Sequence, residues 1–247
     1  TPYEALGTHD DSRETDLNSV LVAVAGALTF AVHRVHTEAV NYISAISSLQ
    51  AGMFFLLAFF FYVRSRETRI TYAKRMLYAL SCLNFALSIL SKEEGATFPA
   101  VILLYEWIFG ERVGRPLRER IANEGIRWVK TIAPYFAILA AYLILRSALM
   151  DPVADNSRGT TERWIYFITQ LRAWLHYWAL YFWPVKLNAD NLGFELSNGL
   201  SDLRVWGALA LQAAIWALAW GFRRRHSFAF FAVAWMYVTV LPASSVF

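Results

Sequence analysis

Long apolar runs separated by short charged turns dominate this chain of 247 residues. Hydrophobic residues make up 57% of it and the mean hydropathy is +0.36, yet it also carries 23 Lys and Arg. A soluble domain does not bury so much apolar surface in separate helical lengths, so the expected solvent is lipid. The runs that are almost free of charge are Val20–Val32, Met53–Val63, Met76–Leu90, Phe98–Phe109, Ile132–Leu145, Val205–Trp220 and Phe228–Leu241.

These runs predict an all-α polytopic membrane protein with about seven or eight hydrophobic helices. In a bilayer each backbone polar group must be satisfied within its own segment, and the runs lack the alternation of a barrel strand. We assign residues 1–17 to a polar N-terminal tail and residues 18–247 to a transmembrane helical domain. The chain begins without Met and ends directly after an apolar run, so we expect it to be part of a longer protein.

Lys and Arg gather in three of the gaps between the runs. Five lie in Arg64–Arg75, six in Arg112–Lys130 and three in Arg223–Arg225, whereas His33–Asn41 and Ser91–Ala96 hold one each. The positive-inside rule therefore predicts that the arginine-rich loops are cytoplasmic and that the other gaps face the opposite side. The net charge of +4 is confined to these loops, which argues against nucleic acid as a partner and for membrane lipid.

The segment Trp164–Trp183 breaks this alternation, because it lies between two gaps that are both expected outside. It holds four Trp and three Tyr, with Thr169, Arg172 and His176 on one helical stripe. An interfacial or re-entrant helix fits this composition, and a spanning helix with a polar stripe facing the bundle is the alternative. The other helices are expected at Asn18–Val32, Val40–Val63, Met76–Leu90, Thr97–Phe109, Thr131–Leu149, Leu203–Phe222 and Phe228–Leu241.

Ionisable residues gather in two of the gaps that are expected outside. The first cluster holds His33, His36, Glu38 and Asn41, and the second holds Lys92, Glu93 and Glu94. Such groups at a lipid boundary are costly unless they are paired or functional. A carboxylate beside an imidazole can accept a proton from an attacking hydroxyl, and a Lys can hold a phosphate. The set suits transfer from a phosphate-linked donor whose lipid tail stays in the bilayer.

The same residues also have a purely structural interpretation. Thr37 can cap the second helix with Glu38 in its first turn, and Lys92 with the carboxylates beside it can end one helix and begin the next. Arg172 and His176 can extend from a buried stem to the membrane interface. Two His and one Glu at this spacing do not make a metal site.

Two motifs resemble those of a known enzyme family. The segment HRVHTEAVNYIS resembles the HPVHTEAV-type segment of membrane glycosyltransferases with a GT-C architecture that often carry tetratricopeptide repeats. The segment LSKEEGATFPAVILLYEWIFG is similar to the second hallmark of that family, an LSKE-type motif followed by a helix ending in Tyr/Asp-Trp. The resemblance continues, in order and spacing, through PYFAILAAYLILR, YFWPVKLNAD and WMYVTVLPASSVF, so it covers the chain from about Val20 to Phe247.

The resemblance implies transfer of a sugar from a polyprenyl-phosphate donor to a hydroxyl of an acceptor protein. The reaction is expected on the extracytoplasmic face of a bacterial inner membrane or of the endoplasmic reticulum, and a divalent metal is left open as a cofactor. Taken with the residue chemistry, this predicts a set of functional side chains. The expected catalytic residues are Glu38, His36 and Glu93, and the expected substrate-binding residues are Lys92, His33, Asn41 and Arg172.

The chain also departs from the family pattern. Arg34 stands where the family usually has Pro after the first His, and Ile46 and Ser48 replace a charged pair. The alternative prediction is therefore a non-catalytic accessory or structural subunit that keeps the scaffold and binds other membrane subunits. Aromatic faces such as Phe54–Tyr62 and Trp174–Trp183 offer surfaces for such packing.

Overall fold

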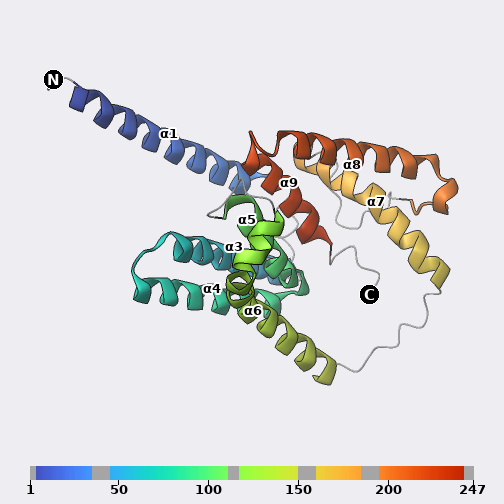
Figure 1. Cartoon of the computed structure of the whole chain (residues 1–247). Coiled ribbons are helices and arrows are strands. Elements are labelled where there is room, and N and C mark those ends of the chain that lie inside the picture. The colour runs from blue at the N-terminus through green and yellow to red at the C-terminus, as the bar shows by residue number, and fades with distance from the viewer. Residues whose placement is uncertain (1–3, 35–44, 111–116, 150–159, 185–194, 242–247) are drawn as a thin grey trace.

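The computed structural model describes residues 4–34, 45–110, 117–149, 160–184 and 195–241, with side chains for 17–34, 45–110, 129–149, 164–184 and 195–241. Within these residues the chain forms eight α-helices and two short 3-10 helices and no strand, which confirms the all-α prediction (Figure 1). The α-helices are α1 (Glu4–Val32), α3 (Ile46–Glu67), α4 (Thr71–Ser91), α5 (Phe98–Phe109), α6 (Leu117–Leu149), α7 (Thr160–Phe182), α8 (Leu203–Phe222) and α9 (Ser227–Val240). The 3-10 helices are η3 (Glu93–Thr97) and η4 (Gly199–Ser201).

Two helices extend well beyond the apolar runs that predict them. α1 begins at Glu4, inside the segment assigned to a polar tail, and α6 begins at Leu117, inside an arginine-rich gap. The extension of α6 holds many Arg, Glu and Lys residues, which are good helix formers whether or not they meet lipid. The extension of α1 also contains Asp, Thr, Ser and Gly, which are weaker helix formers. α1 runs through residue 17 without a break. The domain boundary placed at that residue stays a prediction.

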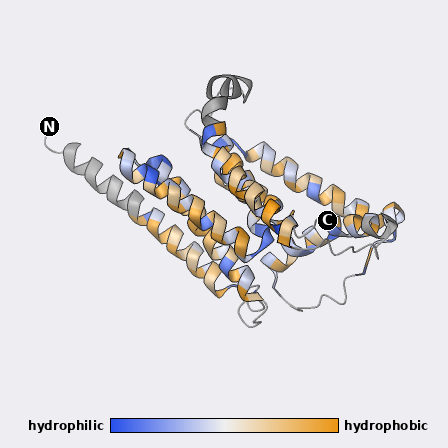
Figure 2. Cartoon of the chain, turned by 90° about the horizontal axis from the view of Figure 1, so that it is seen from below, coloured by the Kyte–Doolittle hydropathy of each residue, from blue (hydrophilic) through white to orange (hydrophobic). Residues whose placement is uncertain are grey.

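Three segments are long and apolar enough to cross a bilayer: Ile46–Glu67, Val129–Leu149 and Leu203–Phe222. Leu17–Val32 and Ser227–Val240 are shorter apolar helices, and Figure 2 shows the long apolar stretches along the helices. These lengths and compositions mark the chain as a membrane protein. α7 is not among the three candidate spans, and its place at the interface stays a prediction.

Small residues bring α3 and α4 close together. Ala51 and Ala58 lie seven residues apart on α3, and Ser81 and Ser88 lie seven apart on α4. The Ser81 hydroxyl donates to the Ala58 carbonyl at 2.7 Å, and the Ser88 hydroxyl donates to the Ala51 carbonyl at 2.9 Å. All four side chains are buried. Close backbone approach at small residues, with hydroxyls bridging the helices, is typical of helix packing in membranes.

Aromatic rings fill the space where four helices meet. The Phe98 ring of α5 lies 5.1 Å from Phe55 of α3, 5.2 Å from Phe85 of α4 and 5.3 Å from Tyr135 of α6, measured between centroids. These four side chains are almost fully buried. α9 closes the cluster, because its Trp235 ring packs edge-on against Phe59 of α3 at 4.8 Å. Part of the aromatic face of α3 that was expected to meet partner helices is thus used within the chain.

A buried ion pair joins the ends of α3 and α5. The Arg66 Nε atom lies 2.8 Å from Glu106 Oε1, and the Arg66 Nη2 atom donates to Glu106 Oε2 at 3.1 Å. The Tyr62 hydroxyl donates to the same carboxylate at 2.7 Å. Only 5% of the Glu106 side chain is exposed, so its charge depends on these two partners.

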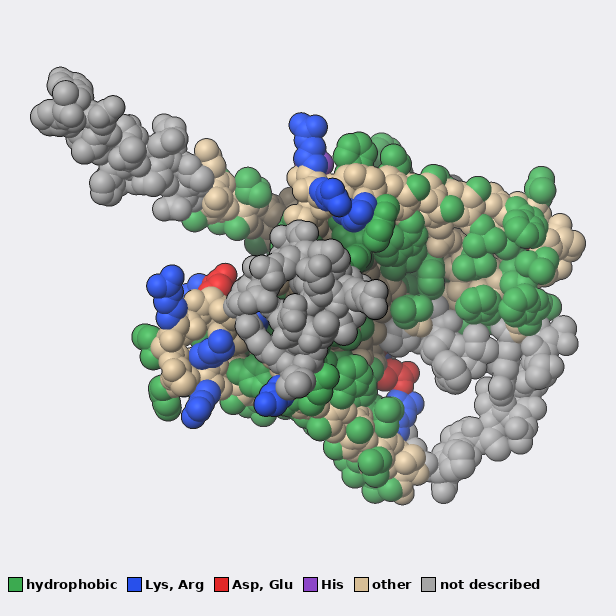
Figure 3. Space-filling view, in the orientation of Figure 1, with side chains coloured by type: hydrophobic (Ala, Val, Ile, Leu, Met, Phe, Trp, Pro, Cys, Tyr) green, Lys and Arg blue, Asp and Glu red, His purple; other side chains and the backbone are tan. Residues whose placement is uncertain are grey.

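The bundle has two chemically different ends. On α3, Ser48 lies near the start and Arg66 near the end, so 18 residues, or about 27 Å of helix, separate them. Lys92 contacts Ser48 at one end, and the basic turn between α3 and α4 lies at the other. Figure 3 shows Lys and Arg around that turn, at the left, and separately around the turn between α8 and α9, at the top. The separation matches the roughly 30 Å thickness of a hydrocarbon core.

Candidate functional site

A sharp turn between α4 and α5 carries the second ionisable cluster. α4 ends at Ser91, Lys92 is extended with φ −160° and ψ 145°, and η3 follows at once. The Lys92 amide donates to the Ser88 carbonyl at 3.0 Å, and the Gly95 amide donates to the Lys92 carbonyl at 3.1 Å. Pro99 then stands in the first turn of α5, where its missing N–H removes no helical hydrogen bond.

Gly95 fits this turn because no side chain fits there. A Cβ at residue 95 would lie 2.8 Å from the Ile89 amide nitrogen and 2.9 Å from the Ser88 carbonyl carbon, both backbone atoms of α4. We expect Gly95→Ala to push η3 away from α4 and to lower the free energy of unfolding by about 1–3 kcal/mol. Denaturant titration of the protein in detergent measures this change.

Gly207→Ala is the matched control for Gly95→Ala. Gly207 lies within α8, and a Cβ there meets nothing within 4 Å. Alanine in a helix interior is favoured over glycine by roughly 0.5–1 kcal/mol, so this variant should be as stable as the wild type or more so. Equal stability losses in the two variants would show that the close approach at Gly95 has no energetic role.

The turn places a lysine, a carboxylate and a hydroxyl together. The Lys92 Nζ atom donates to Ser48 Oγ at 2.9 Å and lies 2.9 Å from Glu94 Oε1. The second oxygen of that carboxylate, Glu94 Oε2, is buried and has no hydrogen-bond partner among the described residues. A buried polar atom without a partner costs free energy. Glu94 Oε2 can therefore accept a proton or a hydrogen bond from a hydroxyl group.

These three side chains lie at the polar end of a cavity of about 320 Å³ between α3, α4, η3 and α9. The remaining wall is mostly apolar and comes from Ala51, Gly52, Phe55, Leu56 and Trp235, with Ser88, Gly95 and Thr239 beside it. A site with an ionic end and an apolar body fits an amphiphilic molecule, with its charged part at Lys92 and its hydrocarbon part along α3.

Glu93 faces a different direction from Glu94. Its carboxylate forms an ion pair with the Arg146 guanidinium of α6, and 58% of the Glu93 side chain is exposed. Arg146 also donates to the Tyr142 hydroxyl at 3.3 Å. Lys92 and Glu94 thus lie on the cavity wall, and the substrate-binding role expected of Lys92 stays a prediction. The catalytic role expected of Glu93 stays a prediction.

The first ionisable cluster is described only at its start. His36, Glu38 and Asn41 lie outside the described residues, so their expected roles stay predictions. His33 is described: its Nε2 atom lies 2.8 Å from the Tyr181 carbonyl oxygen, and its ring stacks on the Tyr181 ring at 5.4 Å. These contacts join the end of α1 to the end of α7.

Arg172 holds the segment before α8 against α7. Its Nη1 atom donates to the Glu195 carbonyl at 3.1 Å and to Ser197 Oγ at 3.0 Å, and it lies 3.7 Å from Asp202 Oδ2. Asp202 also caps α8, because its carboxylate accepts from the Arg204 amide at 3.0 Å. Hydrogen bonds from Arg204 hold the pKa of Asp202 below its usual value, so the cap stays ionised at neutral pH. The substrate-binding role expected of Arg172 stays a prediction.

The part of the chain that the structure describes contains no candidate metal site. No group of three His, Cys, Asp or Glu side chains there lies close enough to hold an ion.

The fold and the site together define a helical membrane protein with an amphiphilic cavity at one end of its bundle. Sequence comparison identifies its relatives. The chain is 33% identical to protein O-mannosyl-transferase TMTC3 from Homo sapiens over an alignment of 177 residues, which covers 62% of this chain and 19% of the human protein. It is 39% identical to protein O-mannosyl-transferase tmtc2 from Xenopus laevis over 85 residues, which are 34% of this chain and 10% of that protein.

A third relative, protein O-mannosyl-transferase Tmtc3 from Drosophila melanogaster, is 33% identical over 116 residues, or 46% of this chain and 12% of the fly protein. The chain therefore spans less than a fifth of the length of these relatives. No family model matches the chain, and no solved structure matches it. The matches confirm the resemblance noted in the sequence: the chain is related to the TMTC-type protein O-mannosyl-transferases.

Proposed function

We propose that this chain is part of a membrane glycosyltransferase that transfers mannose from a polyprenyl-phosphate donor to a protein hydroxyl on the extracytoplasmic face. The main support is the cavity at the turn between α4 and α5, where Lys92, Ser48 and Glu94 form a polar end on an otherwise mostly apolar wall. The names of the three relatives support the sugar and the protein acceptor.

In this proposal the donor lies with its phosphate at Lys92 and the first part of its lipid along α3. The acceptor hydroxyl attacks the anomeric carbon of the sugar, forming a new C–O bond as the bond to the phosphate oxygen breaks. The polyprenyl phosphate leaves with the electron pair, and its charge is stabilised by the Lys92 ammonium. The proton of the acceptor moves to Glu94, whose Oε2 atom has no partner among the described residues.

The position of the cavity agrees with an extracytoplasmic site. Lys92 lies at the end of the bundle opposite the basic turn between α3 and α4, which the positive-inside rule assigns to the cytoplasm. Glu38, His36, His33 and Asn41 are expected from the sequence on the same side of the membrane as Lys92.

Lys92→Met tests the proposed contact with the donor phosphate. A hydrogen bond to a charged group contributes about 1.5–3 kcal/mol, so we expect KM for the polyprenyl-phosphate mannose to rise roughly ten-fold or more. The measurement is transfer of labelled mannose to protein in membranes that contain the full-length protein. Lys74→Met, which removes an exposed lysine near the start of α4, is the matched control and should leave KM unchanged. Equal KM values in all three proteins would remove Lys92 from the donor site.

A further inference from the structure

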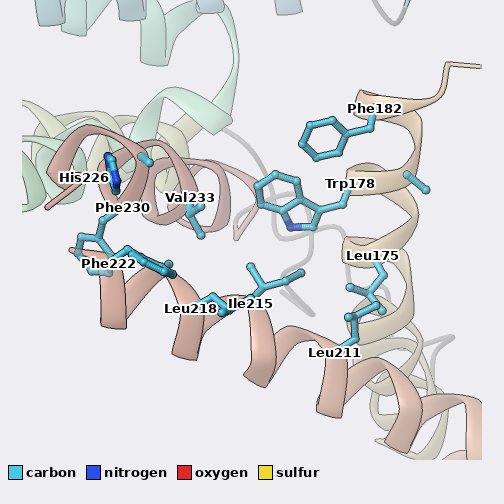
Figure 4. Close-up of a pocket in the computed structure, with 13 residues that line it drawn as sticks. Leu175, Trp178, Phe182, Leu211, Ile215, Leu218, Phe222, His226, Phe230 and Val233 are labelled. Carbon is cyan, nitrogen blue, oxygen red and sulfur yellow. The ribbon is translucent and has the colours of Figure 1, made fainter.

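A second and larger cavity lies between α7, α8 and α9. Its volume is about 650 Å³, within the range of about 300–1,000 Å³ that is usual for small-molecule sites. Figure 4 shows Trp178 and Phe182 of α7 on one wall and Ile215 and Leu218 of α8 on another. The lining is apolar except at one end, where the His226 ring lies 6.2 Å from the Phe222 ring.

That end of the cavity adjoins a strongly basic turn. Arg223, Arg224, Arg225 and His226 connect α8 to α9. The Arg223 guanidinium lies over the Trp220 ring at 4.0 Å and donates to the Trp220 carbonyl at 2.7 Å, so it is held against α8. Arg224 and Arg225 are exposed.

No acidic residue offsets this charge on either neighbouring helix. The sequence from Leu203 to Leu241, which contains all of α8 and α9, has no Asp or Glu. The turn therefore joins a concentrated positive charge to an apolar cavity. Basic clusters at the ends of membrane helices, and basic pockets between them, attract lipids with anionic head groups.

We propose that the cavity between α7, α8 and α9 binds one anionic phospholipid. An acyl chain lies between Trp178 and Leu218, and the phosphate is held by Arg224 and Arg225 beside His226. The aliphatic and aromatic walls hold the acyl chain by van der Waals packing, and the arginines select the anionic head group over a zwitterionic one.

This site is separate from the proposed donor site and does not rest on the proposed function. α9 contributes to both cavities, with His226 beside its start and Thr239 near its end. The two residues are 13 positions apart, or about 20 Å along the helix. A lipid held at the basic turn therefore lies at the opposite end of α9 from Lys92, and it is expected to act as a structural or regulatory ligand.

Native mass spectrometry of the detergent-purified full-length protein tests the head group. Phosphatidylserine is titrated against phosphatidylcholine of the same chain length, and one phosphatidylserine should bind in preference. Each arginine near such a surface contributes about five-fold in affinity, so Arg224→Gln with Arg225→Gln should weaken binding roughly 25-fold. Arg69→Gln with Arg75→Gln removes the same charge at the turn between α3 and α4 and should leave this binding unchanged. Equal losses in the two double variants would overturn the proposal, because they would indicate attraction by net charge alone.

A second variant tests the cavity itself. Ala229 lines the cavity on α9, and Ala229→Trp fills part of it with an indole ring. The proposal expects this variant to lose the bound phosphatidylserine while keeping the thermal unfolding temperature of the wild type. It also expects soluble glycerol phosphate not to displace the lipid. Retained lipid in Ala229→Trp would contradict the proposal, because the acyl chain would then not occupy the cavity. Displacement by glycerol phosphate would also contradict it, because the arginines would then bind a phosphate without its acyl chain.

Discussion

Glu94→Gln is expected to lower the kcat of mannose transfer by about 10²–10⁴-fold, the usual contribution of a general base. The Gln amide keeps the size of the side chain and can still accept a hydrogen bond from Lys92, but it cannot accept the proton of the acceptor hydroxyl. Glu94 is the carboxylate on the cavity wall, with one oxygen 2.9 Å from Lys92 and the other buried without a described partner. Transfer of labelled mannose to protein in membranes measures the effect.

Glu93→Gln is the matched control because it removes the neighbouring carboxylate in the same turn. Glu93 is paired with Arg146 on the outside of the turn, so this variant should keep most of the transfer activity. The reverse result, with activity lost in Glu93→Gln and kept in Glu94→Gln, would support the role that the sequence assigned to Glu93. Full activity in both variants would exclude both carboxylates as the base and leave Glu38 as the candidate.

Glu106→Gln is expected to lower the free energy of unfolding by about 3–5 kcal/mol, because it leaves a largely buried guanidinium without its counter-charge. Arg66 is 18% exposed and makes two contacts of 3.1 Å or less to the Glu106 carboxylate. The Tyr62 hydroxyl would keep an acceptor in the amide oxygen, so most of the loss should come from the ion pair between Arg66 and the carboxylate. Denaturant titration of the purified protein in detergent measures the change.

Glu67→Gln is the control for Glu106→Gln. Glu67 pairs with Arg64 on the surface of α3, where both side chains are more than half exposed. Exposed pairs contribute about 0–1 kcal/mol, so this variant should unfold close to the wild type. The same midpoint for both variants would show that the buried pair does not hold α3 against α5.

The sequence predicts the helices well where a helix coincides with an apolar run. α8 has the expected bounds, Leu203–Phe222, and α5 and α9 begin or end within one residue of their predicted limits. α6 begins much earlier than expected, at Leu117. Hydropathy identifies only the part of a helix that can lie in lipid. A helix can continue into a charged segment whose residues have good helix propensity, although hydropathy alone predicts a loop there.

The candidate site is only partly predictable for a geometric reason. The position of Lys92 at a polar turn follows from the sequence, but the choice between Glu93 and Glu94 does not. Successive residues of a 3-10 helix point about 120° apart, and the register is set by the close contact of Gly95 with α4. Ser48 shows the same limit, since its contact with Lys92 spans 44 residues and depends on the packing of α3 against α4.

Glu106 shows what the sequence interpretation overlooked. It lies inside the run Phe98–Phe109, which was treated as almost free of charge. A single carboxylate in an apolar helix needs a partner, and Arg66 is a partner that the sequence offers. The partners of Arg172 could not be predicted in this way. Glu195 and Ser197 lie 23 and 25 residues further along the chain, outside the helix of Arg172, so helical spacing gives no sign of these contacts.

Photo-crosslinking tests directly whether the cavity at Lys92 holds the lipid-phosphate donor. The probe is a polyprenyl-phosphate mannose with a photoreactive group on its first isoprene unit, added to membranes that contain the full-length protein. We expect labelling of peptides that contain residues 48–56 and 88–95, with the labelling reduced in Lys92→Met. Labelling confined to the cavity between α7, α8 and α9, or labelling that is unchanged in Lys92→Met, would contradict this expectation.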